Sequence, residues 1–113
     1  FSKGWCPPHP TFFVRRSIFD SFGNFDLNFR IAADVDLMMR FLERNKIKSK
    51  YIPEVWVKMR MGGVSNKNLK NIWLQNKEII HSFNKNNLPV NLLKFLILKI
   101  ISRIAQLFKR PSQ

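Results

Sequence analysis

Acidic residues and cysteine are both scarce in this chain. Seven Asp and Glu side chains stand against twenty Lys and Arg in 113 residues, which gives a formal net charge of +13. The single cysteine, Cys6, excludes a disulfide within the chain and provides no metal-site spacing, as expected for a reducing compartment. No apolar run reaches the roughly eighteen uncharged residues that a membrane-spanning helix needs, and no signal-peptide pattern is visible.

The basic excess is uneven along the chain. Residues 1–65 carry eleven basic and six acidic side chains, whereas residues 66–113 carry nine basic side chains and Glu78 as the one acid. A basic tail of this kind predicts a polyanionic neighbour, either nucleic acid or an anionic membrane surface. The length allows at most one domain. Because the sequence begins at Phe1 within what reads as a folded segment, we expect a C-terminal fragment of a longer protein.

Three short apolar runs have the composition of β-strands. They lie at residues 11–14, 50–53 and 55–57. A proline separates the second run from the third, which favours edge positions or a bend. The first ten residues contain three prolines and a glycine, which favour an extended loop.

Four segments have helical spacing or helix signals. They are residues 17–22, 34–44, 68–84 and 90–108. Gly23 closes the first segment, since glycine adopts the positive φ that helix ends favour. Asp34 is placed to act as N-cap of the second. The third has one polar exception, Asn76, on its apolar face.

The last predicted helix contains no acid and is strongly amphipathic. On a wheel at 100° per residue, one half carries Asn91, Lys94, Lys99, Ser102, Arg103, Gln106, Lys109 and Arg110. The other half is apolar, although Leu92 and Phe95 intrude on the polar side. This pattern favours a helix in a membrane interface, and five side chains are predicted to meet anionic lipid: Lys94, Lys99, Arg103, Lys109 and Arg110. The alternative is an ordinary surface helix packed on the domain.

Two acids, Asp34 and Asp36, stand at the mouth of the second predicted helix. Asp34 can cap the helix while Asp36 favours its positive end, which is the commonest role for acids there. The pair could instead form a D-x-D metal site, although such pairs typically follow a buried strand. A third interpretation is a general base that deprotonates a hydroxyl. The residues alone leave these three interpretations open.

Four ordered pieces of the chain resemble one enzyme family. They are HPTFFVRRSIFDSFGNFD at residues 9–26, IAADVDLMMRF at 31–41, YIPEVWV at 51–57 and RMGGVS at 60–65. In order and spacing they are similar to the second half of the family 2 inverting glycosyltransferases, especially the bacterial members that build lipopolysaccharide, capsule and exopolysaccharide. The resemblance covers roughly residues 5–65.

The resemblance implies a fold and a division of the chain. The fold would be part of a GT-A type α/β sandwich, followed by two C-terminal helices. Residues 1–65 would be the acceptor side of the transferase domain, and residues 66–113 a helical, basic extension. Ala33-Asp34 falls on the family's acid-Asp motif, which assigns the general base to Asp34. Asp36 is then an alternative base or a support.

The resemblance also implies the remaining site residues. His9 and Thr11 would lie on the acceptor side of the pocket. A loop with Arg60, Gly62, Gly63 and Ser65 would close toward the diphosphate of the donor. The full-length enzyme would use a divalent cation, Mg²⁺ or Mn²⁺, whose ligand motif is not in this chain. We therefore expect the isolated chain not to turn over nucleotide-sugars.

The implied parent enzyme transfers a sugar from a nucleotide-sugar to a saccharide or lipid-linked acceptor, with inversion. It would act in cell-surface polysaccharide biosynthesis, in the cytoplasm and peripheral at the inner face of the cell membrane. The alternative is a non-enzymatic basic module that binds an anionic membrane or nucleic acid. Nucleic acid is the less favoured partner, because the Phe residues follow the apolar pattern rather than alternating with Lys on one face.

Overall fold

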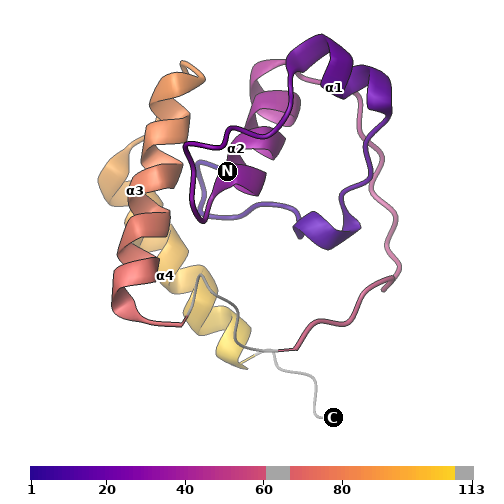
Figure 1. Cartoon of the computed structure of the whole chain (residues 1–113). Helices are drawn as coiled ribbons and strands as arrows, with labels where there is room; N and C mark the ends of the chain where they lie inside the picture. Colours follow the sequence, from indigo (N-terminus) through magenta and orange to yellow (C-terminus); the bar gives the residue numbers. More distant parts are fainter. Residues whose placement is uncertain (61–66, 109–113) are drawn as a thin grey trace.

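The computed structural model describes residues 1–60 and 67–108, which form helices joined by irregular segments (Figure 1). The elements are η1 (His9–Thr11), α1 (Arg16–Phe22), α2 (Ala33–Met39), η2 (Arg40–Arg44), α3 (Leu69–Lys85) and α4 (Leu92–Phe108). No strand occurs in these residues, so the predicted α/β sandwich is wrong.

The strand predictions at residues 11–14, 50–53 and 55–57 are wrong. Thr11 belongs to η1, and the other residues are irregular, with no strand beside them in the described parts of the chain. A helix pairs its own backbone groups, but a strand must pair with a neighbour. Figure 1 shows residues 46–60 as a plain tube on the opposite side of the view from α3 and α4. Tyr51 and Val55 are exposed there, while the Trp56 ring packs on Phe13 with centroids 5.6 Å apart.

The first half of the chain folds around Phe41. α1 ends at Gly23, whose φ is 85° and whose N–H donates to the Phe19 carbonyl at 2.8 Å, as the sequence predicted. Phe19 and Phe22 of α1 pack on the buried Phe41 ring, with centroid distances of 5.3 and 6.3 Å. Phe41 lies in η2, a π-helical turn that continues α2 and ends at Asn45. The aromatic contacts therefore fix α1 against the end of the α2–η2 helix.

α3 begins and ends where local signals predicted. The Asn68 side chain caps it by accepting the Asn71 N–H at 2.8 Å. Beyond Lys85 the chain turns through Asn87, which has a φ of 55°, and Pro89 follows. These signals act within a few residues, which is why they are readable from the sequence.

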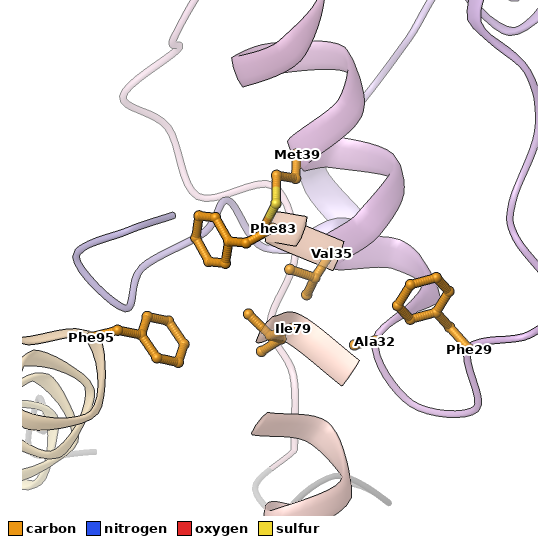
Figure 2. Close-up of a cluster of buried hydrophobic side chains, with 7 residues drawn as sticks. All are labelled: Phe29, Ala32, Val35, Met39, Ile79, Phe83 and Phe95. Atoms are coloured by element: carbon orange, nitrogen blue, oxygen red, sulfur yellow. The ribbon is translucent and has the colours of Figure 1, made fainter. Parts of the chain in front are cut away.

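The largest apolar core lies where α2, α3 and α4 meet. Figure 2 shows its buried members: Phe29, Ala32, Val35, Met39, Ile79, Phe83 and Phe95. The Phe83 ring of α3 meets the Phe95 ring of α4 edge-on, with centroids 5.9 Å apart. Burying one such side chain stabilises the fold by about 1.5–3 kcal/mol. This cluster holds the three helices together.

α4 packs against the rest of the protein through a mixed apolar and polar face. Phe95 and Lys99 face the body of the protein, whereas one apolar side is exposed. We call that side the α4 ridge, and it consists of Leu93, Leu96, Ile97, Ile100, Ile101 and Ile104. No helix in the described part of the chain has the length and apolar character to cross a bilayer.

The N-terminal loop lies directly against the α4 backbone. Gly4 has a φ of 74°, and a Cβ at this position would lie 2.9 Å from the Lys99 Cα. Only a glycine combines this backbone conformation with so close an approach. Phe1 and Cys6, on either side of Gly4, pack against the main core.

Candidate active site at the mouth of helix α2

A carboxylate from α3 occupies the start of α2. Glu78 accepts the backbone N–H groups of Arg30, Ile31 and Ala32 at 2.8–2.9 Å. Burial disfavours the ionised form of this side chain, but the three backbone hydrogen bonds outweigh burial and lower the pKa of Glu78. The N-cap position is Ala32, so the prediction that Asp34 caps the helix is wrong. No side chain caps α2 by a hydrogen bond. Glu78 instead holds the backbone segment that leads into the helix.

Asp34 is partly buried in the first turn of α2. Its Oδ1 accepts the N–H of Val35 at 2.8 Å, and no other hydrogen bond to this carboxylate occurs in the described residues. The Cys6 thiol lies within its electrostatic reach. Burial, and then the negative charge of Asp34, raise the pKa of Cys6. Asp34 therefore lies near the N-terminal loop, and its Oδ2 accepts no hydrogen bond from the described residues.

Asp36 is fully buried and bound on several sides by α3. Its Oδ1 accepts from the Ser82 hydroxyl at 2.5 Å and the Asn86 amide at 3.1 Å, and its Oδ2 lies 3.3 Å from Lys85 Nζ. Lys85 also binds Asp26 at 2.6 Å. With no exposed surface, Asp36 does not meet a substrate in this conformation, and the arrangement is that of a support for α2.

Asp26 belongs to the same polar network at its outer edge. The hydrogen bond from Lys85, together with that from the Asn28 backbone, lowers the pKa of Asp26 to about 2. The α2–α3 junction is thus held by Asp26 and Asp36, which both accept from Lys85, and by Glu78 of α3, which accepts backbone N–H groups ahead of α2.

The two predicted acceptor residues lie together in η1. The His9 ring packs edge-on against Phe25, with centroids 5.8 Å apart, and Thr11 Oγ1 donates to the Pro8 carbonyl at 2.9 Å. Among the described residues, neither side chain forms a hydrogen bond with Asp34. Arg60 is exposed at the end of a described segment. Gly62, Gly63 and Ser65 lie outside the described residues.

The five cations predicted to face lipid occupy different environments. Lys99 Nζ donates to Asn76 of α3 and lies 5.7 Å from the Phe95 ring centroid, so it points into the protein. Burial, reinforced by Arg103, lowers the pKa of Lys99 to about 8. Lys94 is exposed and Arg103 is half-buried, whereas Lys109 and Arg110 lie outside the described residues.

A metal site is not formed by the described side chains. No group of three or more His, Cys, Asp or Glu gathers in residues 1–60 and 67–108 in a way that could hold an ion. Asp34 and Asp36 diverge, since one lies toward the N-terminal loop and the other is bound to α3. The arrangement therefore does not support the D-x-D interpretation of this pair.

Sequence reasoning missed the polar partners on α3. Glu78, Ser82 and Asn86 all serve α2, yet none carries a local signal for that role. One usable signal was Asn76, the polar residue on the apolar face of α3, which accepts a hydrogen bond from the Lys99 side chain.

A scan against protein-family models and searches of curated proteins and of solved structures found no match to this chain.

Proposed function

We propose that this chain forms the acceptor side of an inverting family 2 glycosyltransferase, with Asp34 as the general base. One observation supports this role above the others. The Asp34 carboxylate accepts a single hydrogen bond, from the Val35 N–H, among the described residues, while Glu78 holds the backbone that leads into α2. The ordered motifs of residues 9–65 support the family assignment.

The proposed reaction needs one base and one leaving group. Asp34 takes the proton from an acceptor hydroxyl, and that oxygen attacks the anomeric carbon of the donor sugar from the face opposite the nucleotide. The new C–O bond forms as the bond to the diphosphate breaks, which inverts the configuration. Negative charge then develops on the diphosphate, where Arg60 and a divalent cation held outside this chain would stabilise it.

The proposed substrates are a nucleotide-sugar donor and a saccharide or lipid-linked acceptor. His9 and Thr11, on the η1 turn beside Phe25, would contribute to the acceptor pocket. The process would be bacterial cell-surface polysaccharide biosynthesis, and the location the inner face of the cell membrane, where lipid-linked acceptors reside.

Asp34→Asn in the intact enzyme tests this proposal. Asn keeps an oxygen that can accept the Val35 N–H, so folding should be preserved while the base is lost. We expect kcat to fall on the order of 10²–10⁴-fold with little change in KM, because the carboxylate acts on the reacting hydroxyl. Turnover with a nucleotide-sugar donor is the measurement, and circular dichroism checks the fold.

The matched control is Asp20→Asn. Asp20 is exposed on α1, and its substitution should leave kcat and stability unchanged. Unchanged turnover in Asp34→Asn would refute the assignment of the base.

A further inference from the structure

The α4 ridge is a continuous apolar surface that nothing in the described chain covers. Its six Leu and Ile side chains are between 38% and 70% exposed. They recur at the three- and four-residue spacing of one helix face. Contiguous apolar patches of this kind on a folded protein mark interaction surfaces, whereas single exposed apolar residues do not.

The exposure of the ridge follows from how α4 is anchored. Phe95 packs edge-on against Phe83, Lys99 binds Asn76, and the N-terminal loop meets the backbone at Lys99. Rotating the helix to bury the ridge would break all three anchors. Asn91 also caps the helix start by accepting the Lys94 N–H at 3.1 Å. The packed structure thus presents the ridge outward.

The positive charge of the chain and the cation beside the α4 ridge favour an anionic lipid surface as the partner of the ridge. No acid follows Glu78 in the sequence, and the exposed cation Lys94 lies one residue from Leu93 on the ridge. A second copy of this chain would bring another formal charge of +13 to the surface. An anionic lipid surface supplies the opposite charge together with an apolar interior, so it satisfies both the ridge and its flanking cation.

Helix length sets the orientation. A helix of 17 residues is about 25 Å long, and no helix in the described residues is suited to crossing a bilayer. A ridge along one side of such a helix matches the boundary between headgroups and acyl chains when the helix lies flat.

We propose that the α4 ridge inserts into the surface of an anionic bilayer, with Lys94 among the headgroups and Lys99 turned away toward α3. The ridge therefore makes the principal contact, because Lys99 is bound to Asn76 of α3. This proposal rests on the membrane location proposed above, and it is independent of the role of Asp34.

Vesicle flotation tests the proposal directly. The probes are vesicles of phosphatidylcholine with phosphatidylserine, and vesicles of phosphatidylcholine alone. We expect the chain to float with the anionic vesicles, and the double variant Ile97→Gln with Ile100→Gln to lose at least about tenfold in partitioning. Both side chains are about half exposed, so the fold should persist, and circular dichroism checks this.

The matched control is Val55→Gln with Met59→Gln. These apolar side chains are more exposed than Ile97 and Ile100 but lie outside α4, so this variant should bind like the parent chain. Equal binding by the ridge variant and the parent would overturn the proposal, as would equal loss by the control variant.

Two further outcomes would also overturn it. One is a dimer in sedimentation that depends on Ile97 and Ile100 and forms without vesicles. The other is ridge-dependent binding to a single-stranded oligonucleotide with no vesicle binding. Because the assay contains neither sugar donor nor acceptor, its failure leaves the assignment of Asp34 untouched, and failure of the Asp34 test leaves vesicle binding untouched.

Discussion

The two long helices use their apolar and polar side chains in opposite ways. α3 turns Ile79 and Phe83 inward and uses Glu78 and Ser82 to hold α2. α4 turns Lys99 inward and leaves its ridge in solvent. Both helices have 17 residues and both are amphipathic, so pattern alone does not separate them. The difference lies in whether the partner of the apolar face belongs to this chain.

The largest expected contrast is between a core residue of α3 and a ridge residue of α4. Phe83→Ala removes a fully buried ring and should lower the free energy of unfolding by about 3–5 kcal/mol. Ile100→Ala removes an exposed side chain and should change it by no more than about 0.5 kcal/mol. Urea unfolding followed by circular dichroism measures both. A similar cost for the two variants would show that the ridge is covered within the folded chain.

A second contrast separates the two acids of α2. Asp36→Ala leaves Ser82 and Asn86 buried without this acceptor, and should cost about 3 kcal/mol of stability. Asp34→Ala loses one local hydrogen bond and should cost less than about 1 kcal/mol. Thermal unfolding of both variants measures the difference. Equal costs would mean that Asp34 is also a structural residue, which would weaken its proposed role as base.

The smallest effect concerns acid, and it acts on the α2–α3 junction. Asp26 and Glu78 both have pKa values lowered by folding, Asp26 to about 2. A lowered pKa means that the folded state binds fewer protons than the unfolded state as the pH falls. The stabilisation from these carboxylates is therefore fully present above their unfolded-state pKa values and is lost as the pH falls toward their folded-state values. For Asp26 that loss extends from pH 3.8 to about 2.

Glu78→Gln should flatten this acid-side loss of stability. The variant removes one of the two titrating groups, whereas Asp20→Asn on exposed α1 should leave the profile unchanged. Urea midpoints measured between neutral pH and pH 2 give the profile. An unaltered profile in Glu78→Gln would contradict the role of this carboxylate in holding residues 30–32 ahead of α2.

The positions of α1 and α3 were predicted well from the sequence. Gly23 closed α1 as predicted, and α3 spans Leu69–Lys85, within one residue at each end of the range predicted from its helical spacing. A helix satisfies its own backbone, so these signals suffice once an apolar face exists. Strand predictions at residues 50–57 were wrong, because strand formation needs a paired neighbour and the described residues offer none.

The site was only partly predictable. The sequence drew attention to the mouth of α2, but assigned its cap to Asp34 and left Asp36 open. In the structure no side chain caps α2, and the segment before the helix and Asp36 are held by α3 residues more than forty positions away, Glu78 and Ser82. No spacing rule connects these residues. The orientation of α4 had one signal, the Phe95 that intrudes on the polar half, since that residue is the one that packs inward.

The contact between Gly4 and α4 means that the residue at position 4 affects where the α4 backbone lies. Any side chain there would act as a wedge against the Lys99 Cα, which lies 2.9 Å from an ideal Cβ. Position 4 is remote in sequence from α4. A single methyl group added there could displace the α4 backbone without any change in the sequence of α4. The position of the α4 ridge therefore depends on residue 4 having a hydrogen atom in place of a side chain.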